Sequence, residues 1–187
     1  TEVNLIWYTH EGHHIKGSGM SPEPRPDVLP RVTTDSDGKF QAEVTIPPSL
    51  GSTRPITANI DGQVVASTGF MIQPDLGTME PTKGPAGTEI KFELDGLGWT
   101  MYDTAYFFVY DNKRVGYVCG SDHDDGSVRT FLHAAGEPGY HFIDIYPGLF
   151  KMEEDKPDFT LKPHLSYRNN HPVRPLPAFH YTFEVTE

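Results

Sequence analysis

Apolar and polar residues alternate in short runs along the chain, and this alternation is the strongest constraint on its fold. A period of two places successive side chains on opposite faces of a β-strand. No window of a dozen residues keeps the 3.6-residue period of an amphipathic helix. We therefore predict an all-β chain. Strands are expected at residues 3–8, 40–46, 55–60, 64–72, 89–94, 105–110, 115–119, 128–132, 140–146 and 179–185.

Turn-forming residues separate these runs. The chain has 18 Gly and 17 Pro, and Asp37-Gly38 directly precedes the alternating run 40–46. Asp-Gly favours a tight turn because both residues tolerate a positive φ. Short strands divided by such turns are typical of antiparallel β-sandwiches.

An internal repeat divides the chain into two copies. Residues 3–8 align with 105–110, and Asp37-Gly38 aligns with Asp125-Gly126. The strand pairs 55–60 with 142–146 and 66–72 with 178–185 follow in the same order. The repeat predicts two tandem sandwiches, 1–73 and 74–187, which are joined at Gln73-Pro74-Asp75.

The copies differ in two respects. The second carries an excursion at 149–177, which is charged at first and then rich in Pro, His and Asn. Loops of this length are binding elements, contact arms or mobile segments. Residues 81–99 open the second copy and have no counterpart in the first. We therefore expect the first sandwich to lack its opening strands, which exposes a sheet edge and part of its core.

The opening of the second copy resembles a known family. Residues 81–90 read Pro-Thr-Lys-Gly-Pro-Ala-Gly-Thr-Glu-Ile, and residues 95–99 read Asp-Gly-Leu-Gly-Trp. This order is similar to the opening strand and Gly-x-Gly-aromatic turn of immunoglobulin-like domains of the IPT/TIG type. The resemblance covers residues 74–148 directly and 1–73 through the repeat, whereas 149–177 departs from the pattern. It implies tandem immunoglobulin-like modules of bacterial or archaeal surface proteins, which act as spacers, adhesive units or assembly units without catalytic residues.

Composition and motifs exclude several classes of function. The net charge of −11 argues against nucleic-acid binding, which requires clustered Lys and Arg. No run approaches the ~18 apolar residues of a membrane span. The single Cys119 excludes an internal disulfide and is expected to be a buried, inert thiol. Neither a nucleophile elbow nor a phosphate-binding or dinucleotide motif is present, so we do not expect an enzyme.

Acidic turns suggest calcium. Ca²⁺ takes six to eight hard oxygen ligands, which turn carboxylates and carbonyls can supply. The alternative is that Asp-x-Asp-Gly only forms a hairpin turn. The candidate ligands lie at equivalent turns of the two copies: Asp35, Asp37, Asp122, Asp124 and Asp125.

Histidines and aromatic residues give weaker candidates. His10, His13 and His14 fall close together, but a catalytic zinc site also needs a third ligand in a rigid frame and a base. We expect solvated loop histidines. Among the aromatic residues, Trp7, Phe108 and Phe142 are expected in the core. Tyr102 and Tyr106 are expected at the surface, where they could bind carbohydrate.

The sequence favours an extracellular structural or assembly protein at the cell surface, such as a filament subunit. If Thr1 is the natural start, a strand from a neighbouring subunit could complete the first sandwich; a chain cut at Thr1 is the alternative. The expected contacts are Val3, Leu5 and Trp7 on the first strand and Phe159 and Leu161 on a Pro-rich arm. The alternative function is a carbohydrate- or ligand-binding module of a larger surface protein or enzyme.

Overall fold

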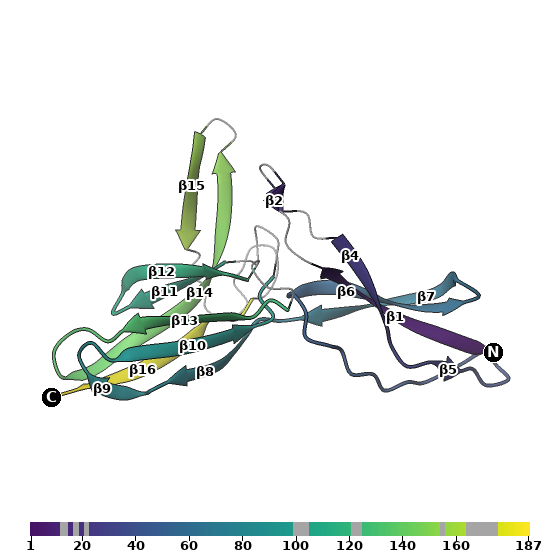
Figure 1. Cartoon of the computed structure of the whole chain (residues 1–187), viewed down its shortest axis with the longest axis horizontal. Coiled ribbons are helices and arrows are strands. Elements are labelled where there is room, and N and C mark those ends of the chain that lie inside the picture. Colours follow the sequence, from purple (N-terminus) through teal and green to yellow (C-terminus); the bar gives the residue numbers. More distant parts are fainter. Residues whose placement is uncertain are drawn as a thin grey trace.

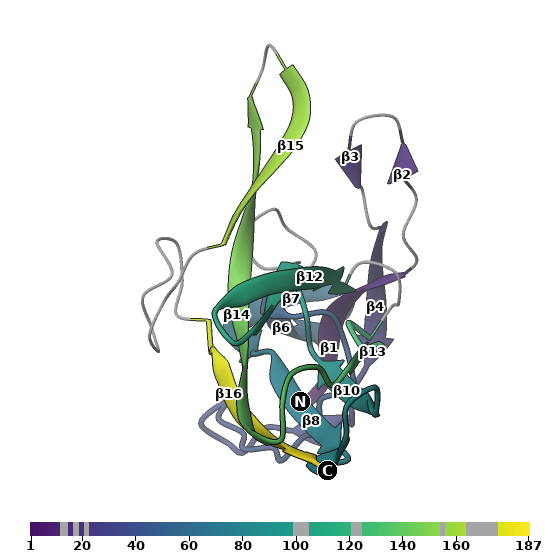
Figure 2. The ribbon, with the colours of Figure 1, turned by 90° about the vertical axis from the view of Figure 1, so that its left-hand side faces the viewer.

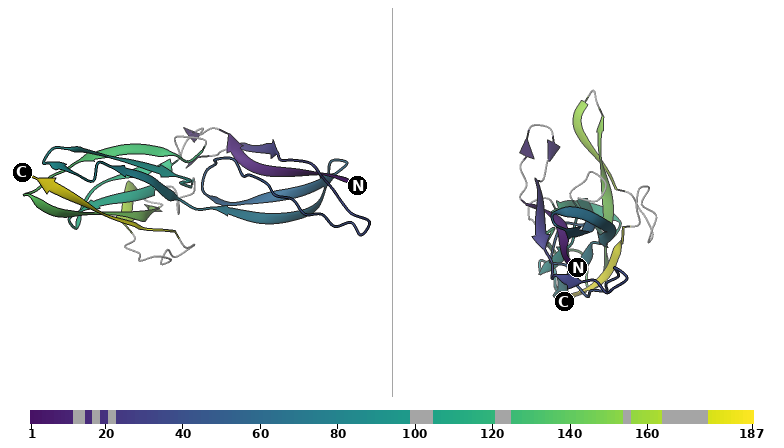
Figure 3. Two further views of the ribbon diagram at one scale, coloured as in Figure 1. Left: turned by 90° about the horizontal axis from the view of Figure 1, so that it is seen from below. Right: turned by 90° about the vertical axis from the view of Figure 1, so that its right-hand side faces the viewer.

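The computed structural model describes residues 1–11, 15–16, 19–20, 23–98, 105–120, 125–153, 156–163 and 176–187. These residues form an all-β structure, and none of them belongs to a helix long and apolar enough to cross a membrane. We call residues 1–73 the first module and residues 74–187 the second module. The modules lie end to end, with the two chain termini at opposite ends (Figures 1 and 3).

One antiparallel sheet dominates the first module. Its strands follow the order β4-β1-β6-β7, and β5 pairs with the start of β1. The core lies on one face of this sheet, where Val3, Leu5 and Trp7 of β1 are buried with Leu29 and Ala58. The strands are β1 (Glu2–Glu11), β2 (Ile15–Lys16), β3 (Gly19–Met20), β4 (Glu23–Val28), β5 (Val32–Thr33), β6 (Ser52–Ile60) and β7 (Gln63–Ile72).

The second module is built from two sheets. One has the order β13-β10-β8, and the other has the order β12-β11-β14-β16-β9, with β15 attached to β14. Only the β9–β16 pair among those described is parallel. The strands are β8 (Asp75–Glu80), β9 (Lys83–Pro85), β10 (Glu89–Asp95), β11 (Ala105–Tyr110), β12 (Lys113–Cys119), β13 (Val128–His133), β14 (Gly139–Glu153), β15 (Lys156–Pro163) and β16 (Phe179–Thr186).

The core of the second module joins these two sheets. Phe92 of β10 meets Phe108 of β11 edge to face, with ring centroids 5.1 Å apart. Alternate residues of β10 are buried, whereas the residues between them face solvent. Ile143 and Ile145 of β14 complete the opposite layer. This two-layer packing is that of a β-sandwich.

The larger sheets share one strand order. β4-β1-β6-β7 of the first module corresponds to β12-β11-β14-β16 of the second. The residues that face the core show how β1 and β11 correspond: they are Val3, Leu5 and Trp7 in β1 and Tyr106, Phe108 and Tyr110 in β11. This correspondence differs by one residue from the sequence alignment of 3–8 with 105–110. The cause is that all six residues of β11 are buried, so its sequence does not reveal which face meets the core.

Several sequence predictions need correction. Residues 40–46 form no strand, because among the described residues they have no partner strand. Phe142 is 59% exposed. Ile143 and Ile145 occupy the core face of β14, so Phe142 lies on the opposite face. The excursion 149–177 begins as an extension of the sheet, because β14 continues to Glu153 and pairs with β15. The hairpins β14–β15 and β2–β3 rise from the same side of the molecule (Figure 2).

Close backbone contacts form the junction between the two modules. The Gly51 N–H of the first module donates to the Leu97 carbonyl of the second over 2.9 Å, and the Leu97 N–H donates to the Gly126 carbonyl over 3.0 Å. Leu50 and Leu97 are fully buried there. A Cβ on Gly51 would lie 2.1 Å from the Gly96 carbonyl oxygen, so the two backbones meet at a distance that only glycine permits.

Candidate functional site

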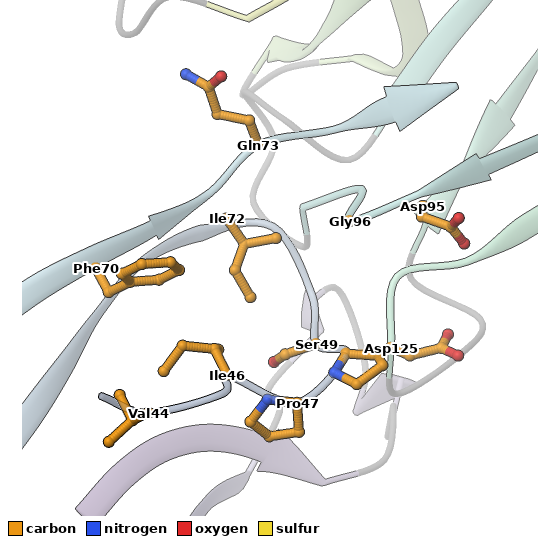
Figure 4. A pocket seen from close by; sticks show the side chains of 11 residues that line it. Val44, Ile46, Pro47, Ser49, Phe70, Ile72, Gln73, Asp95, Gly96 and Asp125 are labelled. Carbon is orange, nitrogen blue, oxygen red and sulfur yellow. The ribbon is translucent and has the colours of Figure 1, made fainter. Parts of the chain in front are cut away.

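A groove of about 640 Å³ opens in the first module beside this junction. Phe70 and Ile72 of β7 form one wall, and Val44, Ile46 and Pro47 of the irregular segment form the other (Figure 4). Asp95, Gly96 and Asp125 of the second module close the junction end. The groove therefore has an apolar floor and walls and carboxylates at one end.

The walls of this groove lack pairing. Among the described residues, 40–48 belong to no strand pair, and β7 pairs with β6 along one edge only. Over residues 63–70, β7 is exposed on both faces, and Val64, Val65 and Phe70 are 56%, 56% and 44% exposed. An apolar sheet edge of this kind can accept a further strand.

The interaction residues predicted on β1 lie elsewhere. Val3, Leu5 and Trp7 are no more than 5% exposed, and β1 pairs with β4 and β6 on its two sides. They are core residues of an inner strand, so the open edge is at β7 and at residues 40–48 instead. The Trp7 ring meets Phe70 edge to face at 6.0 Å, which connects the core to the groove wall. The Trp7 indole N–H is buried without a hydrogen-bond partner among the described residues.

The predicted arm residues lie on a strand. Phe159 and Leu161 belong to β15, which pairs antiparallel with the end of β14. Phe150 of β14 is opposite Leu161 in this register. The arm is therefore a projecting hairpin, and its two apolar residues alternate along one strand.

The acidic turns show the hydrogen bonds of ordinary Asp turns. The Asp35 carboxylate accepts from the N–H groups of Asp37 and Lys39 at 2.9 and 2.8 Å. Likewise, the Asp125 carboxylate accepts from the Ser127 N–H at 2.9 Å. Within the described ranges, no three acidic, His or Cys side chains gather as metal ligands would. Asp122 and Asp124 lie outside the described residues, so calcium binding stays a prediction, which a rise of Tm on Ca²⁺ titration would support.

The predicted carbohydrate and imidazole candidates do not form a site in the described structure. The prediction that Tyr106 lies at the surface is wrong, because its side chain is fully buried in the core of the second module. Tyr102 lies outside the described residues, as do His13 and His14, whereas His10 lies in β1. Cys119 is half-buried near the end of β12.

A histidine–aspartate pair was not anticipated from the sequence. The Asp111 carboxylate lies 2.5 Å from Nδ1 of His141 and accepts from the Phe142 N–H at 2.9 Å. Nε2 of His141 lies 2.9 Å from the Glu137 carbonyl oxygen, and the ring stacks on Tyr110. A carboxylate and a carbonyl are both acceptors, so this site favours the protonated imidazole, which donates from both nitrogens.

The hydrogen bonds explain the pKa shifts of this pair. Hydrogen bonds to Asp111 and to the Glu137 carbonyl raise the pKa of His141. Burial acts to raise the pKa of Asp111, but hydrogen bonds with His141 and Phe142 and the nearby charges of His141 and Lys113 together lower it. With both ring nitrogens engaged, His141 has no free nitrogen to act as a base, so the pair fastens the β11–β12 turn to β14.

Comparisons with family models, curated proteins and solved structures found no match for this chain. The groove is therefore the candidate site on geometry alone. Sequence reasoning missed Ile46, Phe70 and Ile72 as its lining. The missing counterpart of residues 81–99 was the signal that could have located it.

Proposed function

We propose that this chain is an extracellular structural element of a cell-surface protein or filament, built from two immunoglobulin-like modules. Its first module takes up a β-strand from a neighbouring subunit. The packing of two sheets, which are antiparallel apart from the β9–β16 pair, supports the immunoglobulin-like assignment of the second module. The shared strand order of the larger sheets supports the same assignment for the first.

The open groove is the observation that carries this proposal. Residues 40–46 have the alternation of a strand, yet no described strand pairs with them. Val44, Ile46 and Ile72 are only partly buried although they pack against the core of the first module. An added strand would pair the open backbone groups and cover these side chains together. We assign the β14–β15 hairpin, with Phe159 and Leu161, to contacts between subunits.

The oligomeric state tests the proposal. Light scattering across a range of protein concentrations should show self-association of the full chain. Ile46→Asp should weaken this association at least tenfold, because it places a charge on an apolar wall of the groove. Val115→Asp on β12 is the matched control, since Val115 is 56% exposed and does not line the groove. A strict monomer in which residues 40–48 are fully protected would refute assembly through the groove.

A further inference from the structure

The first module has two open edges, one at β7 and one at residues 40–46. The second module shows which strands pair with the equivalent edges. In the second module, β9 runs parallel to β16 at Glu184–Thr186, and β10 pairs with β13. β16 corresponds to β7, and β13 corresponds to residues 40–46 by the Asp-Gly alignment. Both cover strands belong to one stretch of chain, residues 83–95.

The position of the groove matches the position of this stretch. Counting from Gly38 and Gly126, Ile46 is equivalent to Ala134. The Ala134 N–H donates to the Thr88 carbonyl at 2.8 Å, and its carbonyl accepts from the Gly87 N–H at 2.7 Å. Ile46 lines the groove, and among the described residues no backbone hydrogen bond of this kind reaches it.

The β7 wall of the groove also matches the position of β9 in the second module. β9 joins the last residues of β16, and the last residues of β7 are Met71 and Ile72. Ile72 and Gln73 line the groove. The groove of the first module thus lies between two positions whose equivalents in the second module bind β9 and the start of β10.

Residues 81–95 have features suited to crossing between two sheets. The Thr88 hydroxyl donates to the Pro85 carbonyl at 2.7 Å and so closes the turn between β9 and β10. A Cβ on Gly84 would lie 2.5 Å from the Thr88 hydroxyl oxygen, so glycine permits this close approach. Beyond the turn, Ile90, Phe92 and Leu94 are at most 1% exposed and fill the core at alternate positions.

We infer that the groove of the first module is a docking site for a strand–turn–strand segment with the chemistry of residues 81–95. This partner carries a Gly-x-x-Gly-Thr turn followed by apolar residues at alternate positions. One of its strands runs parallel to β7 and the other pairs with residues 40–46. Residues 81–95 carry this pattern within the second module, where Ile90, Phe92 and Leu94 fill the core. This inference rests on the proposed strand uptake and names the segment that provides it.

An extended chain tests the inference. A copy of residues 75–105 is joined ahead of Val3, because Val3 takes the place of Tyr106 in the observed register. Hydrogen exchange should slow at least tenfold at the amides of Val44, Ile46 and Met71. The matched control is the same extension with serine at the copied positions of Ile90, Phe92 and Leu94, which keeps the length and the turn but cannot fill the core. Amides of the native β10 in the second module report that the chain is folded in each case.

The outcomes separate this inference from the proposed assembly. Protection with the apolar extension and none with the serine extension supports the docking site, even if the unextended chain is a monomer. Equal protection with both extensions, or with neither, overturns it, even if the unextended chain self-associates. Full protection of Val44 and Ile46 in an unextended monomer also overturns it, because the edges would then already be covered.

Discussion

The two modules share a four-strand sheet order but differ in what lies across from it. In the second module, β13 pairs with β10, which pairs with β8, and twelve buried residues form one core between this sheet and the larger one. In the first module, residues 40–46 occupy the place of β13 with no described partner, and only five buried residues form the core. The difference shows that a strand-forming sequence becomes a strand only when a neighbour can take up its backbone hydrogen bonds.

The connections differ in a complementary way. In the second module, Asp111 and Asn112, with φ of 46° and 63°, join β11 to β12 in a two-residue turn. The first module uses such a turn, Asp61-Gly62, between β6 and β7 instead. Each module has its long insertion at the hairpin where the other has the tight turn. The shared strand order therefore tolerates long connections at either hairpin, because those lie outside the core.

The largest expected effect separates the closed core from the open one. Phe92→Ala should lower the free energy of unfolding of the second module by about 3–5 kcal/mol, because Phe92 is 1% exposed and meets Phe108. Ile46→Ala should cost less than about 1 kcal/mol, because no described strand packs over it. Urea unfolding measures both. A similar cost at both positions would show that the first module is closed as well.

The junction gives the next largest effect. Gly51→Ala should destabilise the chain by about 2–3 kcal/mol, because the new Cβ would lie 2.1 Å from the Gly96 carbonyl oxygen. The Gly51–Leu97 hydrogen bond would be lost with it, so the modules should unfold in separate calorimetric transitions. Gly116→Ala is the matched control, since nothing lies within 4 Å of its new Cβ. Equal melting temperatures for the two variants would refute a rigid junction.

Much of the strand pattern was predictable from the sequence because alternation is a local property. The runs 3–8, 55–60, 89–94 and 179–185 all lie within observed strands. Residues 40–46 have equally clear alternation, but their state depends on a partner that no local pattern reveals. β11 shows the second limit, because apolar residues at all six positions hide which face meets the core. Tyr106 lies on the core face with Phe108, contrary to the predicted surface position.

The site was harder to predict than the strands. Its walls come from residues 44–47 and 70–73, which are brought together only by the sandwich, while its end comes from the second module. The contact between Gly51 and Leu97 joins positions 46 residues apart through backbone groups, which have no sequence signature. Only the repeat, through the missing counterpart of 81–99, pointed toward an open first module.

A pH effect of intermediate size should be confined to the second module. The raised pKa of His141 gives stability that is fully present below about pH 6.5 and is lost as the pH rises through the folded-state pKa. The lowered pKa of Asp111 gives stability that is present above about pH 3.8 and is lost as the pH falls through its folded-state value. The contribution of the pair should therefore be greatest between these limits.

Asp111→Asn tests this pH dependence because Asn keeps the positive φ of the turn but removes the charge. The variant should lose about 1–2 kcal/mol at pH 5.5 and less at pH 9, as measured by urea unfolding. Asp144→Asn is the control, since the Asp144 carboxylate meets a His180 side chain that is half exposed. A loss that is the same at both pH values would show that the Asp111–His141 pair is not charged in the folded protein.

The smallest effect concerns the surface of the β10–β13 pair that the first module lacks. Glu93 is opposite Arg129 in this register, and the Arg129 guanidinium donates to its carboxylate at 3.0 Å. Because the Arg129 side chain is 81% exposed, Glu93→Gln should cost no more than about 0.5 kcal/mol. That value, beside about 3–5 kcal/mol for the adjacent Phe92, would show that the covering strand stabilises the sandwich through its inward residues. A loss above about 1.5 kcal/mol in low salt would instead show that charge pairing across β10 and β13 holds the layer in place. A partner segment for the first module would then lack this contribution, because Gln41 is equivalent to Arg129.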